Sequence, residues 1–336
     1  MPSLRLFPYR QLIAIEKLVS SLSWGRKLKQ LPWARAVYAA LYKTFRPAGP
    51  LQAEVRGLRV HLDPADTLIT RCLLVYGGVW EPLETEIFVS LVQPGMVVID
   101  VGAHIGYYTL LAARSVGQEG RVFAFEPAPA SYGLLCRNLE SNGCDQVVAV
   151  RKAVAAHSGV ARLWLSPESS ALNKLLASDG GNAWVEVGTT SLDDYFADYT
   201  GRLDVIKIDT EGAEQLILDG MQRLLRRHRD LAIFTEFFPN ALQSCGSPPK
   251  QYLHDLEQLG FHLFHLHEER HALRPFAMEC LPALLPKLMA QNNRWPTINL
   301  LCARGDWVAK AEALCTPPVL RRSREMARAA AIASLL

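Results

Sequence analysis

Short runs of apolar, often β-branched residues alternate with longer amphipathic stretches along most of the chain, and this alternation limits the folds that it can adopt. The expected strands lie at about 96–101, 121–126, 147–154, 203–209, 231–236, 261–266 and 297–303, and the expected helices at about 106–115, 129–142, 213–227 and 250–259. Short apolar strands separated by amphipathic helices indicate a mainly parallel sheet covered on both faces. The sequence therefore predicts an α/β fold, a doubly wound, mostly parallel, seven-stranded Rossmann-like sheet with helices on both faces.

The remaining segments depart from this rhythm. EVRGLRVHL at 54–62 is typical of a strand or hairpin edge, and TEIFVSLV at 85–92 is typical of a helix. The polar segment 166–188 predicts a mobile excursion, and the prolines of 267–296 predict an irregular insertion. We therefore predict a basic amphipathic helical arm at 1–50, lead-in strands and a helix at 51–95, the main domain at 96–304 with its variable insertion at 267–296, and a basic Ala-rich tail at 305–336.

Composition argues against a membrane-spanning or secreted protein. No apolar run approaches the roughly 18–20 residues that a membrane span requires, and Glu16 and Lys17 interrupt the apolar segment near the N-terminus. The seven cysteines never form CxxC, and their number is odd. This pattern fits free thiols in a reducing compartment better than a disulfide framework or a zinc site, so we expect a cytoplasmic protein.

A glycine turn follows the first strand of the predicted sheet, in the segment VVIDVGAHIGYYT at 97–109. Gly102 allows a sharp turn and leaves room for a ligand against bare backbone, and Gly106 begins the next helix. A dinucleotide fingerprint GxGxxG would need glycine where this chain has His104, because that glycine lets a pyrophosphate approach the helix N-terminus. The spacing DxGxxxG therefore favours a nucleoside ligand without phosphates, although a plain strand–helix turn is the alternative.

Two acidic residues accompany the turn. Glu126 ends the second strand in FAFEP, 24 residues after Gly102, where a carboxylate can accept both hydroxyls of a ribose. Asp100 precedes the turn and can order it or meet a cationic part of the ligand. A nucleoside with a positive centre and no phosphate is S-adenosylmethionine, which we predict as the cofactor.

A charged patch lies where a buried strand is expected, in LDVIKIDTEGAEQLI at 203–217. Lys207 lies inside this strand, although a central parallel strand is usually apolar throughout. Because a buried lysine is costly unless it is paired, we expect a carboxylate beside it, and alternation places Asp209 on the same face. Glu211 and Glu214 follow at the entrance of the next helix, where acidic residues also interact favourably with the helix dipole.

Four segments, IDVGAHIGYYT, FAFEP, TSLDDY and IKIDTEGAE, occur in this order, and together they resemble the FkbM-type family of S-adenosylmethionine-dependent methyltransferases. The resemblance covers roughly residues 75–265, and IKIDTEGAE is its most specific element. It implies the seven-strand fold and methyl transfer, usually to a hydroxyl of a sugar, polyketide or similar natural product. It also implies that Gly102, Gly106 and Glu126 meet the cofactor and that Asp209, Glu211 and Glu214 form an acidic motif. His104 stands where the family more often has asparagine.

Methyl transfer to a hydroxyl requires a group that removes its proton. Asp209 is the first candidate for this base and His104 is the second. Alternatively, oxygen ligands from Asp209 and Glu236 hold a divalent cation such as Mg²⁺. The predicted catalytic set is Asp209, His104, Lys207 and Glu211. The predicted cofactor-binding set is Asp100, Gly102, His104, Gly106, Glu126 and Asp209, and the predicted substrate contacts are Glu214, His265 and His267.

The last two of these residues lie in HLFHLHEERH at 262–271, which holds four of the nine histidines. His265 and His267 share a face if the strand extends that far, and this spacing suits a metal ligand pair. Histidines at a strand end without a ligand are the favoured interpretation, because no matching Cys/His pair accompanies them.

The N-terminal arm is strongly basic. Residues 1–47 hold nine Lys/Arg against Glu16 alone, whereas the whole chain has a formal net charge of +3. Apolar residues recur at helical spacing in 10–46, so the arm can lie on the inner membrane surface as a peripheral contact. The alternatives are a helical subdomain packed on the core and a contact between copies in a homo-oligomer. No recognised nucleic-acid module accompanies the basic residues, so we expect no nucleic-acid partner.

The predicted partner is a small-molecule or glycan acceptor of the methyl group. The irregular segments 166–188 and 267–296 are expected to select it. Two other functions stay open at this point. One is a membrane-associated, catalytically weak methyltransferase-like binding module, and the other is a nicotinamide-dependent oxidoreductase, against which His104 and Tyr107 argue.

Overall fold

The computed structural model describes residues 3–22, 31–75, 78–166, 169–175, 183–290 and 297–315. The chain divides into two compact units, Met1–Trp80 and Glu81–Ala331, which we describe separately. No helix within the described residues is both long enough and apolar enough to cross a membrane. The domain boundaries expected from the sequence stay predictions.

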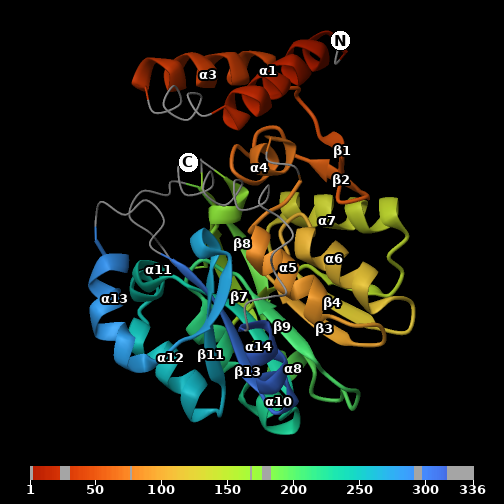
Figure 1. Ribbon diagram of the computed structural model, residues 1–336. Helices are drawn as coiled ribbons and strands as arrows, with labels where there is room; N and C mark the ends of the chain where they lie inside the picture. Colours follow the sequence, from red (N-terminus) through yellow and green to blue (C-terminus); the bar gives the residue numbers. More distant parts are fainter. Residues whose placement is uncertain are drawn as a thin grey trace. The chain divides into compact units, whose positions relative to one another are not determined.

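The first unit contains two long helices, a hairpin and a short helix (Figure 1). Its elements are α1 (Ser3–Ser21), α3 (Pro32–Phe45), β1 (Leu51–Val55), β2 (Leu58–Leu62) and α4 (Ile69–Val75). The hairpin expected around 54–62 is therefore present, and β1 pairs with β2 in antiparallel register. The two helices and α4 share a small core that includes Tyr9, Leu12, Tyr42 and Cys72.

The second unit is built on an eight-stranded sheet with the order β12-β11-β13-β10-β9-β3-β4-β5. Its strands are β3 (Val97–Val101), β4 (Arg121–Phe125), β5 (Val147–Val150), β9 (Val205–Ile208), β10 (Leu231–Phe237), β11 (His262–His267), β12 (Ala272–Pro275) and β13 (Ile298–Arg304). All seven strands expected from the sequence are present, and β12 extends the sheet at one edge. The sheet is mixed, because β13 runs antiparallel to β10 and β11, and β12 runs antiparallel to β11.

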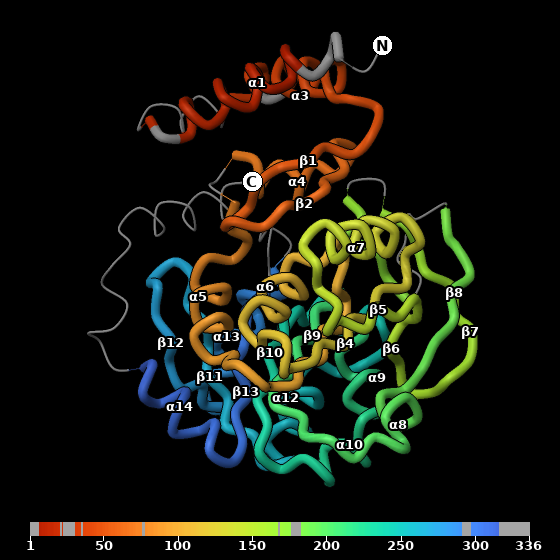
Figure 2. Tube along the Cα trace, turned by 90° about the vertical axis from the view of Figure 1, so that its right-hand side faces the viewer, coloured from red at the N-terminus to blue at the C-terminus, as the bar shows by residue number. Residues whose placement is uncertain are grey.

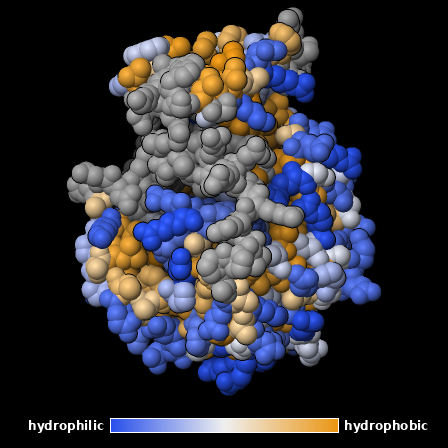
Figure 3. All heavy atoms as spheres, in the orientation of Figure 1, coloured by the Kyte–Doolittle hydropathy of each residue, from blue (hydrophilic) through white to orange (hydrophobic). Residues whose placement is uncertain are grey.

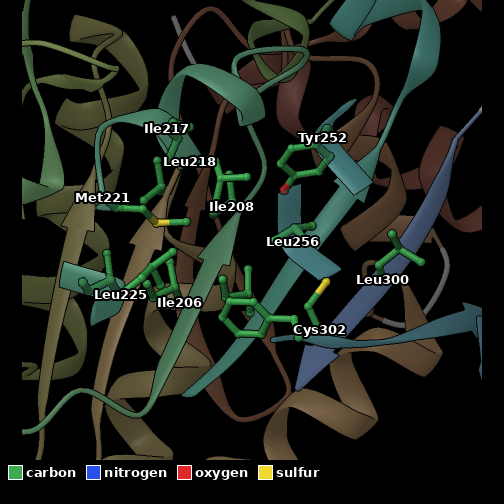
Figure 4. Packing of buried hydrophobic residues seen from close by; sticks show 14 of the residues in the cluster. Ile206, Ile208, Ile217, Leu218, Met221, Leu225, Tyr252, Leu256, Leu300 and Cys302 are labelled. Carbon is green, nitrogen blue, oxygen red and sulfur yellow. The ribbon is translucent and has the colours of Figure 1, made fainter. Parts of the chain in front are cut away.

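Helices cover both faces of this sheet, as expected for a doubly wound fold (Figures 1 and 2). They are α5 (Pro82–Leu91), α6 (Tyr107–Val116), α7 (Pro129–Asn142), α8 (Leu192–Tyr195), α9 (Glu214–Asp219), α10 (Gln222–Arg227), α11 (Pro239–Ser244), α12 (Pro249–Gln258), α13 (Leu281–Leu288) and α14 (Asp306–Cys315). On one face, Ile206 and Ile208 of β9 and Leu300 of β13 pack with α9, α10 and α12 (Figure 4). On the other face, Phe88 of α5 packs edge-on against Phe234 of β10.

Several sequence expectations need correction. The strand expected over 147–154 ends at Val150, and Ala153–Val154 forms β6 of a separate sheet with the order β6-β8-β7. The other strands of this sheet are β7 (Gly159–Trp164) and β8 (Trp184–Thr190), so part of the polar segment 166–188 is a regular strand. Its residues 167–168 and 176–182 lie outside the described residues.

Two further corrections concern helices. The helix expected over 213–227 is divided into α9 and α10 at Gly220 and Met221, and Asp193 caps the start of α10 by accepting from the N–H groups of Arg223 and Leu224. The described part of the segment 267–296 is not irregular, since it contains β12 and α13. Residues 306–315 of the expected tail form α14, and 291–296 and 316–336 lie outside the described residues.

Candidate functional site

The glycine turn after β3 joins three neighbouring strands. Gly102 has φ +82°, and a Cβ at this position would lie 1.9 Å from the carbonyl oxygen of Asp209 at the end of β9. The backbone N–H groups of Gly102 and Ala103 both donate to the carbonyl oxygen of Phe125, at 3.0 Å. Only glycine fits at 102, because both the left-handed backbone and the contact with residue 209 exclude a side chain. β3 and β9 pair in parallel, so Asp209 lies beside the turn as expected.

Glu126 follows β4 and faces the turn. Its carboxylate accepts the backbone N–H of His104 and the backbone N–H of Ala128, each at 2.8 Å. His104 has a left-handed backbone, with φ +52°. Burial raises the pKa of Glu126 to about 7, although these two hydrogen bonds work to lower it. Each carboxylate oxygen keeps a second lone pair, so two hydroxyl groups of a ligand can still donate to Glu126.

A pocket opens at the carboxyl ends of β3 and β4, with an empty volume of about 530 Å³ that includes space open to solvent. Gly102, Glu126 and Asp209 line it, together with the apolar side chains of Val101, Phe125, Val154, Leu163 and Leu175. The pocket lies where the strand order reverses, between β3 and β9, which is the usual ligand position in such sheets.

One wall of the pocket comes from a short 3₁₀ turn, η1 (Ser170–Leu172). The hydroxyl of Ser170 lies 2.7 Å from Nε2 of His104, and Asn173 also lines the pocket. The sequence analysis did not single out these residues, because it assigned the whole segment 166–188 to acceptor selection. In the sequence, polar Ser170 and Asn173 stand beside apolar Leu172 and Leu175, and this mixture could have indicated a segment that lines a pocket.

This pocket fits the nucleoside part of S-adenosylmethionine. Apolar walls suit an adenine ring, the bare backbone of Gly102 permits close approach, and Glu126 supplies acceptors for two ribose hydroxyls. The donor set contains no arrangement for a pyrophosphate, since His104 occupies the position where a dinucleotide turn has glycine.

A buried lysine lies beneath the pocket rim. The ammonium nitrogen of Lys207 is 2.9 Å from Oε1 of Glu84 and 3.1 Å from Oδ2 of Asp209, and it lies 4.2 Å from the ring centroid of Tyr108. The side chains of Lys207 and Glu84 are 3% and 2% exposed. Burial works to lower the pKa of Lys207, but Asp209, Glu84 and Glu81 together raise it well above the ordinary value. The expected carboxylate partner of Lys207 is thus present, and Glu84 is a second one.

Four carboxyl groups gather around the end of this network, and we call Glu81, Asp209, Glu211 and Glu236 the acidic rim. Burial and Glu84 raise the pKa of Glu81 to about 8, and burial and Asp209 raise that of Glu211 to about 8. Burial and Glu211 raise the pKa of Glu236 well above the ordinary value. Near neutral pH Glu81 and Glu211 therefore carry protons much of the time, whereas Asp209 is held beside the charged Lys207.

The first of these residues is placed by the start of α5. Glu81 precedes α5 with a left-handed backbone, φ +45°, and its carboxylate accepts from Asn299 Nδ2 at 2.7 Å and from the Tyr108 hydroxyl at 3.2 Å. The first N–H groups of α5, those of Leu83 and Glu84, donate to the carboxylate of Glu268, each at 3.1 Å. Glu81 and Glu84 were not among the predicted site residues, although both lie within residues 75–265, which the family resemblance covers.

Asp100, Gly106 and Glu214 lie outside the pocket lining, as Lys207 and Glu236 also do. Asp100 is buried on the Lys207 face of the sheet and accepts from the Thr109 hydroxyl at 2.5 Å. Gly106 begins α6. Glu214 is fully buried, and one of its oxygens accepts from Thr210 and Gly212, which closes the turn between β9 and α9. The roles assigned to these three residues stay predictions.

The paired histidines lie on β11, away from this pocket. The ring centroids of His265 and His267 are 3.8 Å apart, and burial and His267 lower the pKa of His265 to about 4. Within the described residues, no group of three or more His, Cys, Asp or Glu side chains is arranged to hold a metal ion. The predicted cation at Asp209 and Glu236 therefore gains no support from the described part of the chain.

Comparisons with known proteins give the family. The family model described as the Methyltransferase FkbM domain matches residues 100–268, just over half of the 336 residues. Methyltransferase sdnD of Sordaria araneosa is 28% identical over 155 residues, which covers 37% of this chain and 60% of that protein. Methyltransferase 1 of Beauveria bassiana is 27% identical over 144 residues, covering 37% of this chain and 57% of that protein.

A solved structure, the S-adenosylmethionine-dependent O-methyltransferase of Thermotoga maritima, aligns with 79% of this chain and 82% of its own, at 15% identity and a TM-score of 0.37. The matched family region contains the glycine turn, Glu126, Lys207 and the acidic motif that ends at Glu214. The chain therefore belongs to the FkbM family of S-adenosylmethionine-dependent methyltransferases.

Proposed function

We propose that the protein transfers a methyl group from S-adenosylmethionine to a hydroxyl oxygen of a small-molecule or glycan acceptor. The observation that carries the proposal is the position of Asp209. Its side chain is 32% exposed, lines the nucleoside pocket with Gly102 and Glu126, and is paired with a buried lysine. A carboxylate held at this point can meet both the cofactor end of the pocket and an acceptor outside it.

The cofactor supplies an electrophilic methyl group on a sulfonium centre. Glu126 accepts hydrogen bonds from the ribose hydroxyls, and the apolar pocket walls exclude water from the adenine ring. Family membership supports this assignment, while the curated relatives are matched over only 60% and 57% of their lengths. The activity of the whole protein is accordingly part of the proposal.

Asp209 acts as the base. As the oxygen–methyl bond forms and the sulfur–methyl bond breaks, the hydroxyl proton of the acceptor passes to the Asp209 carboxylate. Lys207 fixes one oxygen of this carboxylate at 3.1 Å, which leaves the other oxygen for the acceptor. Most of the rate acceleration comes from orientation, because the acceptor oxygen must be held in line with the methyl group.

The protonated members of the acidic rim suit a hydroxylated acceptor. A protonated carboxyl both donates and accepts, so Glu81 and Glu211 can hydrogen-bond hydroxyl groups without repelling Asp209. Neither the binding module nor the oxidoreductase alternative is favoured, because the family match covers the intact glycine turn and acidic motif. The proposal assigns proton removal to Asp209, and assistance by Mg²⁺ stays a prediction.

Calorimetric titration with S-adenosylhomocysteine, with NAD as the control, tests the cofactor. Methyl transfer to hydroxylated acceptors, with and without a chelator, tests the reaction. We expect Asp209→Asn to lower kcat by about 10²–10⁴-fold, with S-adenosylhomocysteine affinity changed less than about threefold, while the exposed Asp145→Asn changes neither. Binding of NAD alone would overturn the cofactor assignment, and full turnover by Asp209→Asn would overturn the role of the base.

A further inference from the structure

The two long helices of the first unit each have an inner face that is fully occupied. α1 and α3 lie side by side in both views (Figures 1 and 2). The hydroxyls of Tyr9 and Tyr42 are 3.1 Å apart in the small core of this unit. Glu16 is buried and accepts from Arg71 of α4, at 2.8 Å from Nε, and from the hydroxyl of Tyr38. The only acidic residue of 1–47 is therefore neutralised inside the unit.

The outer face of the same helices is apolar as well. Three exposed residues of α1 recur at positions that share one side of a helix, and three of α3 do the same. Their exposed fractions are 71% for Phe7, 56% for Ile15 and 61% for Leu18 on α1, and 62% for Trp33, 52% for Val37 and 39% for Leu41 on α3. Figure 3 shows apolar side chains, in orange, gathered over this helical pair. We call these six residues the outer stripe.

Exposed basic residues flank the outer stripe. Arg10 and Lys17 are exposed on α1, where Lys17 directly precedes Leu18 of the outer stripe, and Lys43 is exposed on α3. With Glu16 buried and paired, the described part of α1 and α3 exposes positive charge and no negative charge. A stripe of aromatic and aliphatic side chains beside lysine and arginine is the composition of helices that lie in the interface of anionic membranes.

We propose that the outer stripe docks on an anionic lipid bilayer, with its apolar side chains in the headgroup–acyl boundary and its basic residues against the headgroups. Charge selects this occupant over a second copy of the chain, because two copies would bring positive faces together. The docking is peripheral, since no described helix is long and apolar enough to cross a membrane. The proposal is independent of the proposed methyl acceptor.

Vesicle flotation of the full chain tests the proposal. We expect binding to phosphatidylcholine vesicles that contain roughly 30 mol % phosphatidylglycerol, little binding to pure phosphatidylcholine, and weakening by salt. Phe7→Ser with Trp33→Ser should lower the partition coefficient at least about tenfold. Arg10→Gln with Lys17→Gln should lower it roughly 25-fold, since each basic residue near the surface contributes about fivefold.

Matched controls come from the second unit. Val160 and Trp184 are also exposed apolar residues, at 66% and 43%, and Arg226 and Lys250 are exposed basic residues. Val160→Ser with Trp184→Ser, and Arg226→Gln with Lys250→Gln, should bind anionic vesicles like the parent chain. Unchanged S-adenosylhomocysteine binding and melting temperature show that each variant is folded.

Three results would overturn the proposal. The first is equal binding to neutral and anionic vesicles, and the second is unchanged binding by the Phe7/Trp33 variant. The third is self-association without vesicles that the Phe7/Trp33 variant abolishes, because the outer stripe would then join copies of the chain.

Discussion

The two sides of Asp209 are built on different principles. The side toward Glu126 consists of backbone, apolar side chains and one carboxylate whose partners are fixed N–H groups. The side toward Glu81 consists of carboxyl groups around a single buried ammonium group. The nucleoside side is thus defined by shape. The acidic side is defined by protonation, so its hydrogen-bonding pattern can change with the group that occupies it.

The largest expected effect is a loss of stability when a substitution changes the shape of the nucleoside side. Gly102→Ala should destabilise the protein by about 4 kcal/mol or more, because its Cβ would lie 1.9 Å from a backbone oxygen that cannot move aside. Gly95 has a similar backbone, φ +77°, but a Cβ there meets nothing within 4 Å. Gly95→Ala should therefore cost only about 1 kcal/mol. Urea unfolding of both variants measures the difference, and equal losses would mean that backbone strain alone matters.

The next effect removes the charge on which the acidic side depends. Lys207→Met should cost about 3–5 kcal/mol, since it leaves Glu84 buried without its cation. Arg223→Met is the matched control, because the Arg223 side chain is 61% exposed and solvent screens its ion pairs with Asp194 and Asp193, so its loss should cost far less than that of Lys207. Denaturant titration gives both values. A small loss for Lys207→Met would show that the buried carboxyl groups take up protons and need no cation.

A smaller effect is expected on cofactor binding, when the carboxylate on the nucleoside side is replaced by an amide. Glu126→Gln should weaken S-adenosylhomocysteine about 10–100-fold, because an amide group offers one acceptor oxygen in place of two. Glu81→Gln, on the other side of Asp209, should change this affinity less than about threefold. Isothermal calorimetry compares the two variants. Equal weakening by both would mean that the cofactor extends into the acidic rim.

The smallest effect is a pH dependence of stability. The pKa values of Glu81 and Glu211 rise from 4.5 to about 8, that of Glu126 rises from 4.5 to about 7, and that of Asp100 rises from 3.8 to about 6. The folded state therefore binds more protons than the unfolded state between about pH 4 and pH 8, so these groups make stability fall as the pH rises through that window.

We expect the melting temperature to be a few degrees higher near about pH 5.5 than near about pH 8.5. Glu81→Gln with Glu211→Gln should flatten this dependence, whereas a change at the exposed Glu119 should not. Calorimetric melting across the pH range tests the comparison. Stability that rises steadily with pH would contradict the protonated state of the acidic rim.

The sheet could be predicted because its strands are local and buried on both faces. Val97–Val101 and Val205–Ile208 are continuous apolar or nearly apolar runs, which sequence periodicity detects directly. β7 was missed because its side chains are mostly exposed or half-buried, and β12 because it is a four-residue edge strand that contains proline. The division of α9 from α10 was missed because the cap of α10 comes from Asp193, which is distant in sequence and meets Arg223 and Leu224 only in the fold.

In the candidate site, too, the residues that could be predicted are those that lie on or next to the buried strands. Gly102, Glu126 and Asp209 end neighbouring strands, so the sheet order expected from the sequence already brings them together. Glu84 could not be placed, since it reaches Lys207 from a helix that crosses the sheet face. Ser170 was missed because its meeting with His104 depends on the second, smaller sheet, which the sequence pattern did not reveal. The sequence therefore predicted the contacts between neighbouring strand ends, but it did not predict the contacts between different layers of the fold.

The capping of α5 by Glu268 has a consequence for the order in which the protein matures on the ribosome. The N–H groups of Leu83 and Glu84 donate to the carboxylate of Glu268, which lies 185 and 184 positions later in the chain. Glu81 likewise accepts from Asn299. During synthesis, the acidic side therefore cannot be completed until β13 is available. Since domains fold as units during translation, and both sides of Asp209 belong to one compact unit, the cofactor surface and the acidic rim are completed together, after nearly the whole chain has been made.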